Sequence, residues 1–352
     1  MDKIERLTIV RAQKAFGLKP GAWHVNVQPL SGSPANVAVY VALVPQGGKI
    51  MGMSLDQGGH LTHGHKVSVT GKMWKQVAYG VDPKTETLNY EAVKSIAIAE
   101  KPDIIVAGFT AYPRAIDFKK FRDIAHASGA LLMVDMSHFA GIVAGGEYPS
   151  PFLYADIVTT TVHKTLRGPR AAIIFAREGV KAQRDFPTLG LNGVKKGESL
   201  DLGKRIDRAV FPGMQGGPHE NQIAAVAVAL REAAQPAFKK YALAVKKNAA
   251  VLARELGARG WRIISGGTDS HLVLIDTWMG GKGDHSVSGK DASDKLERAG
   301  IIVNKNAIPF DTRPPADPSG IRLGSAAETT RGRKEKDFVK LAERIDKVLR
   351  GK

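Results

Sequence analysis

The sequence IIVAGF at residues 104–109 decides the fold, together with LLMVD at 131–135 and IVTTT at 157–161. Each is a short, largely apolar run, and a helical pattern at 118–127 separates the first two. Ala171 to Phe175 continues the series. Continuous apolar strands that alternate with helices predict an α/β domain whose parallel sheet is covered on both faces. Ligands of such sheets bind at the carboxyl ends of the strands, so we expect Asp135 and the residues after Thr161 to share one side of the sheet.

A smaller α+β domain is predicted after the glycine-containing stretch Phe211 to Pro218. Helical patterns cover residues 219–234, 236–257, 292–299 and the chain from 334 onward. Strands are predicted at 261–264, at 271–275 and near Ile301. We therefore divide the chain into a large domain at residues 1–232 and a small domain at 233–352. The polar, glycine-bearing stretch 190–203 predicts a surface excursion.

The composition is typical of a globular protein. The chain has 352 residues, 43% hydrophobic and 24% charged, which is enough to bury a sizeable core. It contains no cysteine, which excludes disulfides and thiolate metal sites. It begins with a helical pattern and not with the apolar run of a signal peptide, and no segment approaches the roughly 20 apolar residues of a membrane span. These features predict a cytoplasmic protein that does not enter a membrane.

The formal charge of +17 suits either nucleic acid or anionic small ligands. The basic residues are scattered, with small clusters at Lys195-Lys196, at Lys246-Lys247 and over residues 331–336. Aromatic residues make up only 7% of the chain, so a platform for stacking bases is not indicated. We interpret most of this charge as solvated surface, and nucleic-acid binding stays open as a less favoured alternative.

Lys164 is the first candidate functional residue, because it follows the β-branched strand TTTV at 159–162 and precedes a glycine-containing turn. An amine held at the end of a strand suits Schiff-base chemistry on a carbonyl cofactor. The alternative is a solvated lysine, which is what most strand-end lysines are.

A second motif, LSGSPAN at residues 30–36, precedes an apolar helical pattern. Ser33 is suited to the N-cap, Pro34 to the first helical position, and Gly32 permits close approach of the backbone. The free amides and hydroxyls predict an anion site at the start of the helix. The alternative is an ordinary capped helix.

Two further motifs contain histidine. His60, His63 and His65 lie on a glycine-flanked loop, where no cysteine and one nearby carboxylate, Asp56, make a metal site unfavourable. An imidazole there could stack on a planar cofactor, or the loop could be a polar surface loop. In VDMSH, Asp135 ends a strand three residues before His138. A carboxylate held against a pyridinium nitrogen keeps the ring a good electron sink, although an aspartate that caps the next turn would look the same.

Seven ordered segments resemble the serine hydroxymethyltransferase (glycine hydroxymethyltransferase) family: NVQPLSGSPAN, GGHLTHG, VDMSHFAG, TTTVHKTLRGPR, FPGMQGGP, VNKN and SGIRLGS. They span essentially the whole chain. The resemblance implies an aminotransferase-like large domain of fold type I that binds pyridoxal 5′-phosphate, followed by a smaller C-terminal domain. It also implies reversible transfer of the hydroxymethyl group of serine to tetrahydrofolate, which yields glycine and 5,10-methylenetetrahydrofolate.

For the cofactor, the resemblance implies that Lys164 carries the Schiff base, Asp135 pairs with the pyridine nitrogen and His60 stacks on the ring. The remaining cofactor and catalytic positions that it implies are Ser31, Gly32 and Ser33 at the phosphate, Thr110 and His138 near the ring hydroxyl, and Thr161 and Arg170 in support of Lys164.

For the substrates, the resemblance implies that Arg322 binds the carboxylate of the amino acid, which suits the two-pronged guanidinium. Leu55, Gly59, Leu61 and Asn306 match positions that contact the folate. Gly216 and Gly217 match glycines that reach the phosphate of a neighbouring subunit, which implies a homodimer or a dimer of dimers.

The sequence departs from the family pattern in three places. Leu30 replaces a histidine or aromatic residue, and Ala171-Ala172 replaces a glycine pair. The family's N-terminal arm carries a glutamate and tyrosines that handle protons and substrate, and nothing resembling its Glu-Gly-Tyr-Pro segment occurs in these 352 residues. Two alternatives therefore stay open: an amino-acid aldolase that uses the same cofactor but handles folate poorly, and a catalytically impaired homologue that binds cofactor or RNA.

Overall fold

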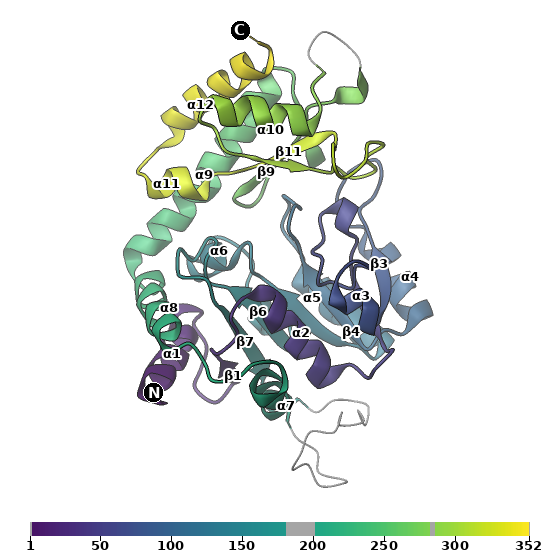
Figure 1. The fold of residues 1–352 in the computed structure, drawn as a ribbon, viewed down its shortest axis with the longest axis vertical. Coiled ribbons are helices and arrows are strands. Elements are labelled where there is room, and N and C mark those ends of the chain that lie inside the picture. The colour runs from purple at the N-terminus through teal and green to yellow at the C-terminus, as the bar shows by residue number, and fades with distance from the viewer. Residues whose placement is uncertain (1, 181–200, 282–285, 352) are drawn as a thin grey trace.

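The computed structural model describes residues 2–180, 201–281 and 286–351, in which two β-sheets are joined through one long helix (Figure 1). The larger sheet has the strand order β1 (Trp23–Asn26), β7 (Ala172–Arg177), β6 (Ile157–Thr161), β5 (Leu131–Asp135), β4 (Ile104–Gly108), β2 (Lys49–Met53) and β3 (Lys75–Tyr79). The five strands from β6 to β3 are parallel. The prediction of an α/β domain with a mostly parallel sheet is confirmed.

Strand β7 is an exception to the predicted parallel series. It pairs antiparallel with β6, so that Thr161 lies opposite Ala172, and antiparallel with β1 on its other side. Residues 162–171 are too few for a parallel crossover, which needs about a dozen residues or more. This tight return keeps the segment that contains Lys164 at the end of β6.

Helices cover both faces of the large sheet, because its strands are apolar on both sides. One core contains Ile104, Val106 and Met133 with α2 (Gly32–Leu43) and α7 (Leu202–Arg208). The alternate residues, such as Ile105 and Val134, belong to the other core with α1 (Asp2–Ala15), α4 (Tyr90–Glu100), α5 (Phe118–Ser128) and α8 (Glu220–Ala233). Every central strand is therefore buried, and only the strand ends are available for a site.

The smaller sheet is antiparallel, in the order β10 (Asn304–Asn306), β11 (Gly320–Gly324), β9 (Leu272–Asp276) and β8 (Arg262–Ile263). It shares a core with α9 (Pro236–Ala258), α10 (Gly289–Arg298) and α12 (Glu335–Leu349). The predicted α+β character is confirmed, but the strand predicted near Ile301 is wrong. Residues 301–303 have no regular structure and the strand begins at Asn304, because this edge strand is polar and carries no apolar signal.

The other elements are short: η1 (Leu55–Gln57), α3 (Val69–Met73), α6 (Ala140–Ala144), η2 (Pro151–Leu153), η3 (Ala209–Met214), η4 (Ile264–Gly266), η5 (Met279–Gly281) and α11 (Ala326–Thr330). Most of the predicted excursion at 190–203, including Lys195-Lys196, lies outside the described residues. The predicted domain boundary at residues 232 and 233 falls at the end of α8 and stays a prediction. Within the described ranges no helix is long and apolar enough to cross a membrane.

Candidate active site

A cavity of about 160 Å³ lies where β4, β5 and β6 end. It brings together the predicted cofactor residues other than Gly216 and Gly217, and it is lined by Ser31, Gly32, Ser33, His60, Phe109, Thr110, Asp135, Ser137, His138, Thr161, His163, Lys164 and Arg170. The lining side chains come from five separate parts of the chain. The parallel sheet and its loops bring them to one place.

Helix α2 begins at the cavity, two residues earlier than predicted. It starts at Gly32 with Ser31 as the N-cap, so the expectation that Ser33 is the N-cap is wrong. Ser31 makes no side-chain hydrogen bond to the helix. A Cβ on Gly32 would lie 2.7 Å from Thr161 Cγ2, so only glycine fits beside β6. The hydroxyls of Ser31 and Ser33 and the free amides of the first turn are therefore available to an anion.

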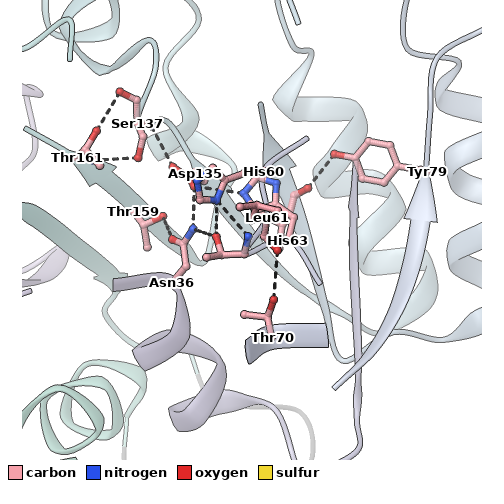
Figure 2. Close-up of polar contacts among 12 residues, drawn as sticks. Asn36, His60, Leu61, His63, Thr70, Tyr79, Asp135, Ser137, Thr159 and Thr161 are labelled. Carbon is pink, nitrogen blue, oxygen red and sulfur yellow. Dashed lines mark hydrogen bonds and ion pairs between the residues drawn. The ribbon is translucent and has the colours of Figure 1, made fainter. Parts of the chain in front are cut away.

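Asp135 forms the floor of the cavity and receives several hydrogen bonds (Figure 2). Its Oδ2 accepts from Asn36 Nδ2 at 2.8 Å and contacts His63 Nε2 at 3.2 Å, and its Oδ1 accepts from the Ser137 backbone N–H at 3.1 Å. Burial raises the pKa of this carboxyl, but the hydrogen bond and charge of His63, with smaller contributions from His60 and Ser137, outweigh it and hold the pKa well below its usual range. The carboxylate is ionised at neutral pH.

His60 lies beside this carboxylate and is neutral. Its Nδ1 accepts from the Thr62 backbone N–H at 3.2 Å and lies 2.7 Å from Thr62 Oγ1. Because Nδ1 is an acceptor, the ring proton is on Nε2. Burial, the neighbouring His63 and the positive charge of Lys164 lower the pKa of His60 to about 4, against the opposing charge of Asp135. An uncharged imidazole suits contact with the face of a planar ring.

Lys164 is partly buried on the segment between β6 and β7. Burial lowers the pKa of its amine, Arg322 and Arg170 lower it further, and Asp135 opposes them. A larger fraction of the amine is therefore unprotonated, as nucleophilic attack on a carbonyl requires. Two other polar atoms of the cavity lining, Thr110 Oγ1 and His163 Nδ1, are buried without a hydrogen-bond partner among the described residues.

The small domain contributes a second wall, which we call the small-domain wall and define as His271, Asn304 and Arg322. Arg322 donates to the Thr110 carbonyl at 2.7 Å and to Asn304 Oδ1 at 3.0 Å. The His271 ring stacks on His138 with centroids 5.8 Å apart. With Lys164, these residues line an adjoining cavity of about 370 Å³. The Arg322 guanidinium therefore lies in a cavity that shares Lys164 with the first cavity.

The remaining predicted residues do not line either cavity. Leu55 begins η1 and Leu61 lies in the turn that follows it, and they are 36% and 42% exposed. A Cβ on Gly59 would lie 1.9 Å from Met53 O, so this glycine has a packing role of its own. Asn306 lies at the end of β10, and Gly216 and Gly217 are exposed.

The sequence did not predict Asn36 and Thr62, which connect Asp135 to His60, or Thr159, which donates to Asn36. It indicated His63 only as a member of the histidine loop, without its contact to Asp135, and it did not predict His271 in the small domain. A signal existed for Asn36, since hydrophobic residues lie on both sides of it in α2, at Ala35 and over residues 37–43. A lone polar residue in such a helix is buried and must find partners. His271 begins an ordinary apolar strand and carried no comparable signal.

The family model described as serine hydroxymethyltransferase matches residues 1–345. The chain belongs to the serine hydroxymethyltransferase family. A serine hydroxymethyltransferase of Desulfotalea psychrophila is 49% identical over 99% of this chain and 75% of the relative, and one of Zymomonas mobilis is 51% identical over 99% and 74%. One of Acidobacterium capsulatum is 48% identical over 99% and 74%.

Serine hydroxymethyltransferases have the fold type I architecture of pyridoxal-phosphate enzymes, and the large sheet described above is of this kind. The chain is therefore a pyridoxal-phosphate-dependent transferase of one-carbon metabolism that exchanges the hydroxymethyl group of serine with tetrahydrofolate. The aldolase and the impaired homologue are not favoured by these matches.

Proposed function

We propose that the cavity at the ends of β4 to β6 holds pyridoxal phosphate, with Lys164 as the covalent anchor and Asp135 as the partner of the ring nitrogen. The observation that carries this proposal is the joint placement of an amine and an ionised carboxylate on one cavity. Ser31, Gly32 and Ser33, at the start of α2, would hold the phosphate.

The lining fits this cofactor on evidence other than the family match. Thr110 Oγ1 and His163 Nδ1 lack partners among the described residues, and a buried polar atom is rarely left without one. A ligand with several polar groups would supply them. Bound pyridoxal phosphate acts as an electron sink for the bond that is broken in the amino acid.

Each protein group has a physical task in this proposal. Asp135 keeps a negative charge where a protonated ring nitrogen would lie. His60 would cover one ring face without adding charge, and His138 and Thr110 would contact the ring hydroxyl. Thr161 and Arg170 would support Lys164.

For the amino acid, we assign the carboxylate to Arg322. Its guanidinium already donates to two oxygens, one of Thr110 and one of Asn304, and a substrate carboxylate would replace such acceptors with a charged, two-pronged one. Leu55, Gly59, Leu61 and Asn306 are assigned to the folate, and the exposed Leu55 and Leu61 support an apolar contact for its ring system.

A homodimer or a dimer of dimers is part of the proposal, as is a cytoplasmic location. The apolar side chains of Leu30, Phe211 and Met214 are 40%, 49% and 39% exposed, which supports their burial against a second copy. Gly216 and Gly217, next along the chain, would then reach the neighbouring cofactor.

The test is glycine formation from serine by the purified protein with and without tetrahydrofolate. We expect turnover that depends on tetrahydrofolate, and equal turnover in its absence would favour the aldolase. Leu61→Asp should raise the KM for tetrahydrofolate, because it places a charge at the proposed apolar contact. Leu153→Asp is the matched control, since Leu153 is 76% exposed and lies in η2, before the amino end of β6, whereas the cavity lies at the carboxyl end of that strand.

A further inference from the structure

One buried amide connects the two groups that would contact the cofactor ring. Asn36, in the second turn of α2, is 1% exposed. Its Nδ2 donates to Asp135 Oδ2 at 2.8 Å (Figure 2). The same nitrogen donates to Thr62 Oγ1 at 2.9 Å, and Thr62 in turn contacts His60 Nδ1. Its Oδ1 accepts from Thr159 Oγ1 at 2.8 Å. We call these five residues, Asn36, His60, Thr62, Asp135 and Thr159, the Asn36 network.

The direction of each hydrogen bond in the network is fixed. An ionised carboxylate can only accept, so the atom of Asn36 beside Asp135 must be nitrogen. With both N–H groups in use, Oδ1 points to β6, and the Thr159 hydroxyl must donate to it. Because Thr62 Oγ1 accepts from Asn36, its own hydrogen is free to point to His60 Nδ1. Every polar atom of the Asn36 amide therefore has a defined partner.

We propose that Asn36 is a positioning residue, which fixes the orientation of the Asp135 carboxylate and, through Thr62, the orientation and protonation pattern of the His60 ring. This inference rests on the proposed function, in which Asp135 and His60 contact the cofactor. Asp135 accepts from Asn36 and His63 at one oxygen and from the Ser137 N–H at the other. These donors hold the carboxylate still while it faces the cavity.

The position of Asn36 in the chain explains why one residue can serve both groups. It lies one turn after Gly32, at the end of α2 nearest the cavity, so the helix that would bind the phosphate also orients the groups beneath the ring. A hydrophobic residue of similar size would fill the same space but would leave the Thr159 hydroxyl and one lone pair of Asp135 without a partner. Packing alone does not account for an amide here.

The experiment compares cofactor binding by the apoprotein forms of the full chain and of Asn36→Ala. We expect the dissociation constant of pyridoxal phosphate to rise by about 10- to 100-fold, the range found when groups that orient a ligand-binding side chain are removed from metal sites. Asn248→Ala is the matched control. Asn248 is also 1% exposed and also donates twice, to Thr329 Oγ1 at 2.9 Å and to the Arg333 carbonyl at 3.2 Å, but it lies in α9. This control should lose stability and keep its affinity for the cofactor.

The pH profile of binding separates positioning from packing. Loss of a donor raises the pKa of Asp135, so the affinity of Asn36→Ala should fall more steeply on acidification than that of the unaltered protein. The titratable groups that act on Asp135, namely His60, His63, His138, Lys164 and Tyr40, are unchanged in the variant. An unchanged dissociation constant with an unchanged pH profile would overturn the proposal.

Thr159→Val provides a second test if Asn36→Ala does not fold. It removes only the hydroxyl that donates to Asn36 Oδ1 and leaves the donors of Asp135 in place, so we expect a smaller loss of affinity. An affinity equal to that of the unaltered protein would again overturn the proposal. Lys164→Ala tests the proposed function independently: if its binding of pyridoxal phosphate is unchanged, the assigned site is wrong, whatever Asn36 does.

Discussion

The two sides of the site differ in how their polar groups are satisfied. In the Asn36 network, the amide of Asn36, the Asp135 carboxylate and His60 Nδ1 have partners within the large domain. Across the cavity, Arg322 of the small-domain wall is held by a backbone carbonyl and a neutral amide. On the proposed assignment, the side that would contact the cofactor has its partners in advance, whereas Arg322 would exchange its present partners for a substrate carboxylate.

Asp135→Asn should have the largest effect, because it removes the charge at the centre of the preformed side while nearly preserving its shape. We expect kcat to fall by roughly 10²- to 10³-fold, the size of effect found when one electrostatic contact is removed from a dry active site. Steady-state kinetics with serine and tetrahydrofolate measures it. A fall of less than about tenfold would mean that the charge of Asp135 does not matter to the reaction.

Arg322→Lys should have the next largest effect, and on the other side of the site. Lysine keeps the charge but cannot donate two parallel hydrogen bonds to a carboxylate. Hydrogen bonds to charged groups are worth about 1.5 to 3 kcal/mol, so the KM for serine should rise roughly 10- to 100-fold. Cofactor affinity should stay unchanged. A variant that loses the cofactor as well would contradict the separation of the two sides.

Acidification should lower the free energy of unfolding through His60, which belongs to the preformed side of the site. Its pKa in the folded protein is about 4, against an ordinary value of 6.5, so the unfolded chain binds more protons between these values. The free energy of unfolding therefore rises with pH between about 4 and 6.5 and gains nothing more from His60 above that window. His60→Asn should reduce the slope of this rise by up to about 1.4 kcal/mol per pH unit.

Denaturant unfolding of the apoprotein at several pH values measures this slope. His126→Asn is the control, because His126 is exposed in α5 and its replacement should leave the slope as it is. An equal slope in the His60 variant and the unaltered protein would mean that His60 is not held neutral.

Thr110→Val should have the smallest effect. Its hydroxyl is buried without a partner among the described residues, so removal of the hydroxyl should leave the stability of the apoprotein within about 1 kcal/mol of its original value. Cofactor affinity should fall only several-fold, through the loss of one hydrogen bond. Thermal unfolding with and without pyridoxal phosphate separates the two effects, and a marked loss of stability in the apoprotein would show that the hydroxyl has a partner within the protein.

The fold could be predicted wherever local pattern and structure agree. Residues 104–108, 131–135 and 157–161 are strands as expected, because the first two runs are almost continuously apolar and every residue of the third is β-branched. The first residue of α2 and the strand at Asn304 were misplaced, since cap geometry and a polar edge strand leave weak signals in the sequence.

The candidate site could be predicted only in part. Lys164 and Asp135 were found from their positions at strand ends, and the motif at residues 30–36 and the histidine loop indicated an anion site and a stacking imidazole. The resemblance to a family supplied the individual roles, together with Thr110, Thr161 and Arg170. Asn36 and His271 were not found, because their importance arises from contacts with Asp135, Thr62 and His138, which are distant in the chain. Such contacts follow from the packing of the sheet and the small domain and have no period or spacing in the sequence.

The most direct test is the visible absorbance spectrum of protein reconstituted with pyridoxal phosphate. The spectrum of the unaltered protein is compared with those of Lys164→Ala and of a control, Lys119→Ala. Lys119 is paired with Asp123 on the surface of α5. We expect the band of the lysine-bound cofactor in the unaltered protein and in Lys119→Ala, and we expect it to change when glycine and tetrahydrofolate are added. In Lys164→Ala we expect no such band. An identical band in Lys164→Ala would contradict the assignment of Lys164 as the cofactor anchor.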